Sequence, residues 1–191
     1  MELARRHPGR IAALVLVSPT TDHFAVFIRI LRLAEQDLAS EQPDVASALG
    51  TSLARTRSLM DHAMREALQH ALHDPVLFTH YWADPAQFQA SIAAWAKPEA
   101  QFDPESFFAV LADFAQVAHA REPVSVPALL VFGGRDPIAP VADVAEGVLE
   151  TLPGARVEVF EDGGHFVHLD RPDRFVETVM EWAGGCVQAP N

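Results

Sequence analysis

The sequence predicts an α/β fold with three buried parallel strands, flanking helices and a long helical insertion after the first strand. Three short runs rich in apolar residues, at 11–17, 126–132 and 156–160, indicate the strands, and the first shows no polar alternation. Such runs are typical of parallel strands covered on both faces. Between the first two runs, apolar residues recur at helical spacing, and no strand signal interrupts them from residue 21 to 122.

The strand and helix patterns predict one structural domain with an inserted segment. Its parts are residues 1–20, with the end of a helix and the first strand, the helical insertion 21–122, and the remaining core 123–191. Asp-Pro pairs within the insertion favour helix starts, since proline's missing N–H is unpaired at that position anyway. The last helix is predicted to begin at Pro172 and to end at Gly184-Gly185, followed by a frayed tail.

The composition excludes several classes of partner. The net charge is −12, from 26 acidic and 14 basic residues, which argues against non-specific nucleic-acid binding and against docking on anionic membranes. The longest apolar run, residues 11–17, is far shorter than the roughly 20 residues that cross a bilayer. The single cysteine, Cys186, cannot form an intrachain disulfide, so we expect a cytoplasmic protein.

Two ionisable residues follow the second and third predicted strands. Asp136 comes after Gly133-Gly134-Arg135, and His165 comes after Gly163-Gly164. Glycines at the ends of strands are expected to let the chain turn sharply. Because parallel strands end at one edge of the sheet, both side chains are expected there. Either motif alone is also an ordinary loop, but an imidazole oriented by a carboxylate is the usual base of nucleophilic catalysis.

The residues around this pair resemble a known family. The matching stretches are Phe132-Gly-Gly-Arg-Asp136-Pro-Ile-Ala-Pro140, then Gly163-Gly-His165-Phe-Val-His168-Leu-Asp-Arg-Pro172, and also residues 2–19. Together they resemble the carboxyl-terminal half of an α/β-hydrolase, whose triad runs serine, acid, histidine along the chain. The resemblance implies a partial α/β-hydrolase fold, Asp136 as the triad acid, His165 as the general base, and residues 21–122 as a helical cap over the active site.

The family's serine motif is absent from these 191 residues. No Gly-x-Ser-x-Gly occurs, and Ser18, at the end of the first strand, is expected only to bond local backbone. The resemblance implies serine-type hydrolysis of an ester-like or other small apolar substrate, with the nucleophile and oxyanion hole missing, so we expect the chain alone to be inactive. Our leading expectation is that the natural polypeptide is longer and that Met1 is internal.

Two alternatives to that expectation stay open. One is a truncated, non-catalytic binding or interaction module, and the other is one half of a split enzyme. The free edge of the first strand predicts self-association or pairing with a partner chain.

Aromatic residues of the insertion are the candidates for substrate contact. Trp82, Phe88 and Trp95 either line an apolar pocket or only pack helices together. The insertion's histidines lack the tight His-Glu-x-x-His spacing of a metal site, and His168, close to His165, has no further ligands nearby in sequence. We therefore expect neither a metal nor another cofactor.

Overall fold

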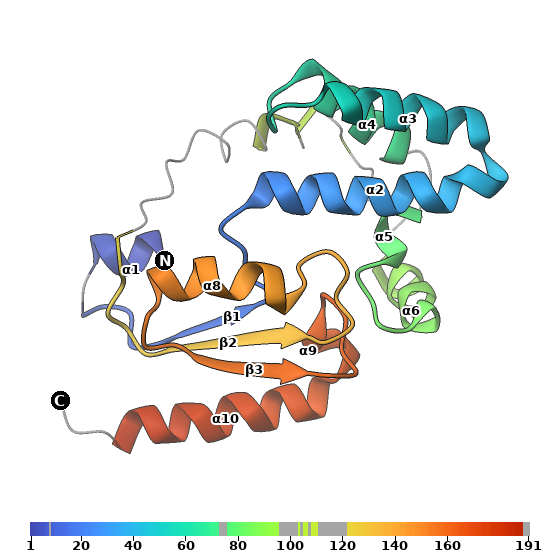
Figure 1. The fold of residues 1–191 in the computed structure, drawn as a ribbon. Helices are drawn as coiled ribbons and strands as arrows, with labels where there is room; N and C mark the ends of the chain where they lie inside the picture. The colour runs from blue at the N-terminus through green and yellow to red at the C-terminus, as the bar shows by residue number, and fades with distance from the viewer. Residues whose placement is uncertain are drawn as a thin grey trace. The chain divides into compact units, whose positions relative to one another are not determined.

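The computed structural model describes residues 1–7, 9–72, 76–95, 103, 105–106, 108–110 and 122–188 (Figure 1). The chain divides into two compact units, which are described separately. The core unit contains Met1–Thr21, Tyr81–Asp84 and the described residues from 122 onward. The helical unit contains Asp22–His80 and the described residues from 85 to 110.

The core unit is built on a sheet of three parallel strands. These are β1 (Leu14–Val17), β2 (Ala128–Gly133) and β3 (Arg156–Phe160), in the spatial order β1-β2-β3. Leu14 pairs with Ala128, and Leu129 pairs with Arg156. All six residues of β2 are buried, as expected for a central parallel strand. The predicted sheet of three parallel strands is confirmed.

The first two strands begin later than the apolar runs suggested, so the predicted starts at residues 11 and 126 were wrong. The ladder opens where the N–H of Leu14 donates to the carbonyl of Pro127, at 2.9 Å. Proline has no N–H to donate in return, so the pairing cannot extend further back. The apolar residues just before this point lie outside the sheet: Ile11, Ala13 and Val126 are half-buried, and Ala12 is exposed.

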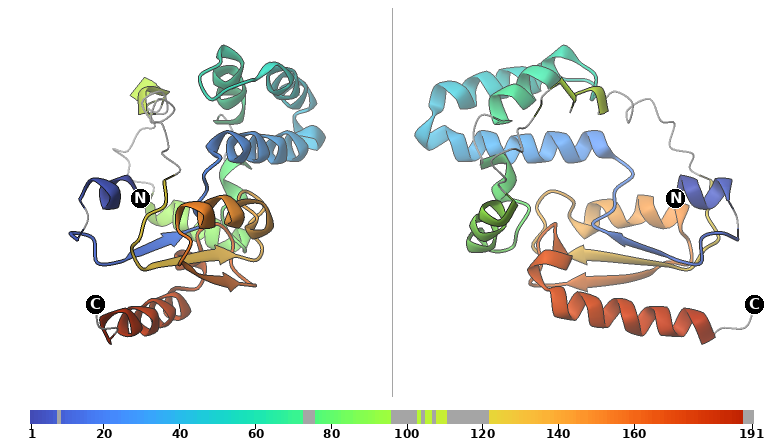
Figure 2. Two further views of the ribbon diagram at one scale, coloured as in Figure 1. Left: turned by 60° about the vertical axis from the view of Figure 1, so that its left-hand side comes forward. Right: turned by 180° about the vertical axis from the view of Figure 1, so that it is seen from behind.

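Helices cover the two faces of this sheet. Figure 1 shows α8 (Val141–Thr151) over one face and α10 (Pro172–Gln188) over the other, and Figure 2 shows the same arrangement from two further directions. The α10 face is apolar: Leu129, Val131, Phe160 and Val167 form a buried cluster, with Val17, Phe175, Val179 and Trp182 packed against it. The short helix α9 (Val167–Asp170) precedes α10, and α1 (Glu2–Arg6) opens the chain. This cover on both faces fits the apolar sequences of β1 and β2, whereas β3 carries Arg156 and Glu158.

The predicted end of the last helix was wrong. Helix α10 continues through Gly184 and Gly185 as far as Gln188. Neither glycine has a positive φ, and a Cβ at either position would meet nothing within 4 Å. Glycine permits a helix end but does not impose one, and inside a helix it costs about 1 kcal/mol relative to alanine. The helix therefore tolerates the pair, while residues 189–191 of the predicted tail lie outside the described part of the chain.

The helical unit contains α2 (His23–Glu41), α3 (Pro43–Arg55), α4 (His62–Leu72), α5 (Val76–Thr79) and α6 (Pro85–Trp95). No strand occurs among its described residues, in agreement with the helical periodicity of the sequence. Helix α2 begins at an aspartate cap, where the Asp22 carboxylate accepts the N–H of Ala25 at 2.8 Å. The buried apolar residues of α2, α3 and α4 are Ile30, Leu31, Ala34, Leu38, Ala46, Leu49, Leu53, Met64, Ala67, Leu68 and Ala71.

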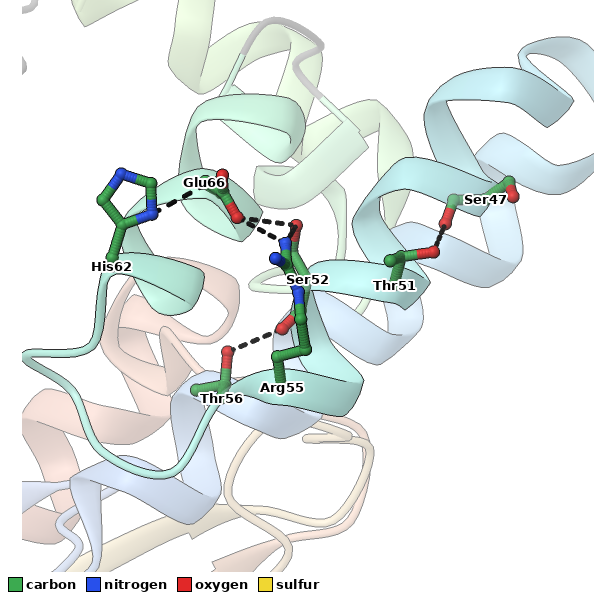
Figure 3. A network of polar contacts seen from close by, with 7 residues as sticks. All are labelled: Ser47, Thr51, Ser52, Arg55, Thr56, His62 and Glu66. Atoms are coloured by element: carbon green, nitrogen blue, oxygen red, sulfur yellow. Dashed lines mark hydrogen bonds and ion pairs between the residues drawn. The ribbon is translucent and has the colours of Figure 1, made fainter.

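A polar network links α3 to α4 at the surface of the helical unit (Figure 3). Glu66 lies at its centre, with Arg55 Nη2 at 2.5 Å, Ser52 Oγ at 3.5 Å and His62 Nδ1 at 3.5 Å. The Thr56 hydroxyl donates to the Ser52 carbonyl at 3.0 Å and closes the end of α3. We call these contacts the Glu66 network.

Among the described helices, none combines the length and the apolar character that a bilayer span requires.

Candidate active site

The loops that follow β2 and β3 are hydrogen-bonded to each other. The N–H of Gly134 donates to the carbonyl of Phe160 at 2.8 Å, and the N–H of Arg135 donates to the carbonyl of Gly163 at 2.9 Å. These bonds continue the sheet beyond its last ladder pair. They bring the next ionisable residue of each loop to the same edge of the sheet.

The glycines in these loops are needed for close approach and not for an unusual backbone angle. A Cβ at Gly133 would collide with the carbonyl oxygens of Gly163 and Gly164. Among the described glycines only Gly9 has a positive φ. The turn predicted after β2 forms, with the N–H of Asp136 donating to the Gly133 carbonyl at 3.3 Å, but the glycines there need no left-handed backbone. Their missing side chains let the two loops touch, and this contact is what places Asp136 beside His165.

Asp136 and His165 form a hydrogen-bonded pair. Nδ1 of His165 lies 2.8 Å from Oδ2 of Asp136, and their side chains are 19% and 0% exposed. The other carboxylate oxygen, Oδ1, accepts the backbone N–H groups of Ile138 at 2.8 Å and Ala139 at 3.0 Å. An ionised carboxylate only accepts, so this set of donors fits its charged form. The arrangement puts the imidazole proton on Nδ1 and leaves Nε2 able to accept one.

Tyr81 lies against the imidazole. Its ring is 5.1 Å from that of His165 at an interplanar angle of 83°, and it stacks on Phe166 at 4.9 Å. The N–H of Phe166 donates to the Tyr81 carbonyl at 3.1 Å, which fixes this segment to the histidine loop. Burial, and then the charge of Asp136, raise the pKa of Tyr81 to about 12. The phenol therefore stays neutral beside the imidazole at ordinary pH.

Ser18 directly follows β1 and contacts the same loop. Its hydroxyl donates to the carbonyl oxygen of His165 at 2.9 Å, and its N–H donates to Val131 at 2.8 Å. The expectation that Ser18 bonds local backbone was wrong, because its partner is 147 residues away along the chain. Ser18 also has φ of 43°, the one positive value among the described non-glycine residues. For a residue with a side chain this left-handed conformation costs about 1–2 kcal/mol.

Asp170 is a buried carboxylate that contacts the same loop. Its Oδ2 accepts the N–H of Gly164 at 2.6 Å and the N–H of Ala83 at 3.2 Å. Its Oδ1 is buried and has no hydrogen-bond partner among the described residues. The sequence assigned no role to Asp170, because nothing in its local pattern indicates partners in two distant loops.

The three aromatic candidates for substrate contact lie in different places. Trp82 belongs to the core unit, where it is buried and packs edge-on against Phe166 with ring centroids 4.9 Å apart. Phe88 is buried inside the helical unit. Trp95 ends α6, but its side chain lies outside the described part of the structure. Substrate contact by all three remains a prediction.

The described histidines other than His165 lie apart from any metal-ligating cluster. No group of three or more histidine, cysteine, aspartate or glutamate side chains that could hold a metal ion occurs within the described residues. His168 packs between the rings of Phe166 and Phe175, at 6.1 and 5.9 Å. Burial lowers the pKa of His168, and the nearby charge of Asp170 partly opposes this.

Comparison with known proteins identifies relatives along almost the whole chain. A family described as the alpha/beta hydrolase fold matches residues 1–172. A pimeloyl-(acyl-carrier protein) methyl ester esterase of Neisseria meningitidis serogroup A is 28% identical over 192 residues, which cover 99% of this chain and 54% of that protein. The serogroup B enzyme of the same name is 29% identical over 186 residues, or 96% of this chain and 64% of that protein. The chain thus spans between half and two thirds of the length of these relatives.

Solved structures show the same fold. A proline iminopeptidase-related protein from Thermus thermophilus superposes with a TM-score of 0.63 at 18% identity, covering 97% of this chain and 60% of that one. A serine hydrolase from Cycloclasticus zankles gives 0.56 at 19% identity, covering 98% and 60%. At these identities the likeness concerns the fold alone.

Proposed function

The chain belongs to the α/β-hydrolase fold family, and from this premise we propose that it carries the acid and the base of a serine-type ester hydrolase. The observation that carries the proposal is the contact between His165 Nδ1 and the fully buried carboxylate of Asp136, at 2.8 Å. A carboxylate that only forms an ion pair needs neither burial nor two amide donors on its second oxygen. A carboxylate that orients a catalytic imidazole has to be held in one geometry.

In the proposed reaction, Nε2 of His165 accepts the proton of a serine hydroxyl as its oxygen attacks the ester carbonyl. The proton on Nδ1 stays in the hydrogen bond to Asp136, whose negative charge stabilises the imidazolium. Nε2 then gives its proton to the departing alkoxide, which leaves as an alcohol. Water repeats the two steps and releases the carboxylic acid, so the base is regenerated.

The proposed substrate is an ester with an apolar acyl part. Aromatic side chains surround the imidazole, since Tyr81 and Phe166 both lie within 5.5 Å of it, measured between ring centroids. Apolar surface of this kind favours hydrophobic ligands. The names of the two meningococcal relatives, methyl ester esterases, support the same class of bond.

The serine and the oxyanion donors are proposed to come from outside these 191 residues. In this family the nucleophile lies on a Gly-x-Ser-x-Gly elbow, and one oxyanion donor is the amide that follows it. No such motif occurs in the sequence. Loss of an oxyanion donor costs about 3–4 kcal/mol of transition-state stabilisation, so the 191-residue chain is expected to hydrolyse no ester on its own.

A pair of proteins tests this proposal. One is the 191-residue chain, and the other is the longest polypeptide read in frame from the native locus, both assayed with p-nitrophenyl esters. Activity is expected only in a polypeptide that includes the elbow, and His165→Ala should abolish it. The matched control is His80→Ala, which removes a histidine that also contacts a carboxylate but should leave the rate unchanged. Hydrolysis that survives His165→Ala would overturn the proposal.

A second candidate is a binding module or one half of a split enzyme, which the edge of the sheet favours. Strand β1 pairs only with β2 among the described residues, and Val15 on it is 37% exposed. An apolar strand edge of this kind favours pairing with another chain, either a second copy or a chain that supplies the elbow. Light scattering after gel filtration tests this, because a monodisperse monomer would exclude self-association.

A further inference from the structure

The peptide backbone at His165 is held on both sides by buried polar side chains. On the amino side, the N–H of Gly164 donates to Asp170 at 2.6 Å. On the carboxyl side, the carbonyl of His165 accepts the hydroxyl of Ser18 at 2.9 Å. The two holding residues come from different places in the chain: Ser18 directly follows β1, and Asp170 lies in helix α9. None of these bonds involves the imidazole itself.

Gly164 fits this arrangement only because it has no side chain. A Cβ there would lie 2.6 Å from the nitrogen of Ala83 and 3.0 Å from Oδ2 of Asp170. The backbone before the histidine is therefore pressed against both the carboxylate and the segment that contains Ala83. Any displacement of this peptide would move the Cα of His165 and with it the ring.

The same carboxylate connects the loop to the residue that packs on the imidazole. Besides Gly164, Oδ2 of Asp170 accepts the N–H of Ala83 at 3.2 Å. Ala83 is two residues after Tyr81, whose ring lies 5.1 Å from that of His165. Asp170 thus fixes the backbone next to His165 relative to the segment that carries Tyr81, whose ring packs on the imidazole.

Ser18 and Asp170 each have a feature that, taken alone, lowers the stability of the fold. Ser18 has a left-handed backbone at φ of 43°, and Asp170 buries a carboxylate oxygen without a partner among the described residues. Buried polar groups normally have partners, and strained residues persist only where the surroundings hold them. Features of this kind concentrate at functional sites.

We infer that Ser18 and Asp170 are positioning residues for His165, which hold the peptide on either side of it so that Nδ1 stays aligned with Asp136. This inference rests on the proposed function for its purpose, although the alignment itself can be measured without catalysis. Neither residue touches the reacting atoms. Their contribution is to restrict the imidazole to the one orientation in which Nε2 faces a substrate.

The Nδ1 proton of His165 provides the direct test. In the folded 191-residue chain, its proton NMR resonance is assigned by its loss in His165→Gln. Ser18→Ala and Asp170→Ala are expected to shift or broaden this resonance, because the ring no longer holds one alignment with Asp136. Asp170→Asn should preserve it, since the amide oxygen still accepts from Gly164. The control Val148→Ala removes buried volume from α8 and should lower Tm without moving the resonance.

Kinetics of the elbow-containing polypeptide give a second readout. Misplacing a catalytic group by about 1 Å can cost about 10²-fold in rate, so Ser18→Ala and Asp170→Ala should lower kcat strongly while KM changes little. Asp170→Asn, which keeps the acceptor for Gly164 and hence the alignment, should retain kcat. Where Ser18→Ala does not fold, Ser18→Gly replaces it. Ser18→Gly removes the hydroxyl and relieves the backbone, so it should be stable and still lose the alignment.

The outcomes separate this inference from the proposed function. A wild-type Nδ1 resonance in Ser18→Ala, Ser18→Gly and Asp170→Ala, with only a lower Tm as in Val148→Ala, would overturn the positioning role. A shifted resonance in these variants, in a protein that hydrolyses no ester even with the elbow, would support the positioning role and refute the esterase. A shifted or broadened Nδ1 resonance together with a lower kcat in these variants supports both the positioning role and the esterase.

Discussion

In the part of the chain that the structure describes, two histidines lie less than 3 Å from a carboxylate oxygen, and only one of these two pairs has the features of a catalytic pair. In the core unit, His165 Nδ1 lies 2.8 Å from Asp136, and in the helical unit His80 Nε2 lies 2.6 Å from Asp37. The histidines are similarly exposed, at 19% and 22%, but the carboxylates differ, at 0% for Asp136 and 40% for Asp37. Distance alone therefore does not distinguish the two pairs, whereas burial of the carboxylate does.

Burial of the carboxylate matters because a buried carboxylate cannot exchange its hydrogen bonds for bonds to water. Water can solvate Asp37, so its pair with His80 is expected to contribute only about 0–1 kcal/mol. The Asp136 side chain is not exposed to solvent. Backbone amides fix its oxygen Oδ1, so that Oδ2 stays directed at the imidazole. The nitrogens differ as well. Binding through Nδ1 leaves the outer nitrogen Nε2 of His165 for a substrate, whereas His80 uses that outer nitrogen for its own pair.

The largest expected contrast between the pairs is in catalysis. In the elbow-containing polypeptide, Asp136→Asn should lower kcat by about 10⁴-fold, because an amide favours the wrong imidazole tautomer. Asp37→Asn should leave kcat unchanged. Steady-state hydrolysis of a p-nitrophenyl ester measures both, and equal effects of the two substitutions would show that burial does not separate the pairs.

The second contrast is in folding stability. Asp136→Ala leaves the buried amides of Ile138 and Ala139 without their acceptor, at about 1–3 kcal/mol for each. Asp37→Ala should lower the free energy of unfolding by less than about 1 kcal/mol. Urea unfolding followed by circular dichroism compares them. A loss as large in Asp37→Ala would mean that its exposed pair is more strongly coupled to the fold than its exposure implies.

The third contrast uses Tyr81, the one tyrosine of the chain. Its absorbance should report ionisation near pH 12 in the folded protein and near pH 10 in urea. The unfolded chain therefore loses this proton first, and the free energy of unfolding falls as pH rises from about 10 to 12. Asp136→Asn should lower the folded midpoint only in part, because burial is the larger cause. Asp37→Asn should not change it, and a folded midpoint near 10 would contradict the burial of Tyr81.

The smallest effect is expected at the Glu66 network. Glu66→Gln weakens its contact with the exposed Arg55, and surface pairs of this kind contribute about 0–1 kcal/mol. The loss should shrink further in high salt, because exposed charges are screened. A salt-independent loss of more than about 2 kcal/mol in the free energy of unfolding, measured with urea, would show instead that the Glu66 network behaves like a buried ion pair.

Much of the core unit could be predicted because its signals are local. Apolar runs located the three strands, and glycine pairs followed by Asp136 and His165 located the edge of the sheet where they meet. The errors have local causes too. Strand starts depended on Pro127, which has no N–H for the ladder, and the end of α10 depended on glycines that permit helix termination without requiring it.

The contacts around the pair could not be predicted, because they join distant parts of the chain. Ser18 and His165 are separated by 147 residues, and Ala83 and Asp170 by 87. No periodicity links such positions, since each bond exists only when separate elements have already packed together. Tyr81 is a similar case, because its place on the imidazole follows from where its segment attaches to the loop.

The sequence by itself determined the class of the protein: its parallel strands, the order of acid and base, and the absence of the serine motif from these residues. Those properties follow from side-chain hydrophobicity and backbone preferences, which act over a few residues. Only the tertiary structure decided which histidine–carboxylate pair is buried and which backbone groups hold it. Burial and long-range hydrogen bonds depend on the packing of the whole unit, so no short stretch of sequence contains them.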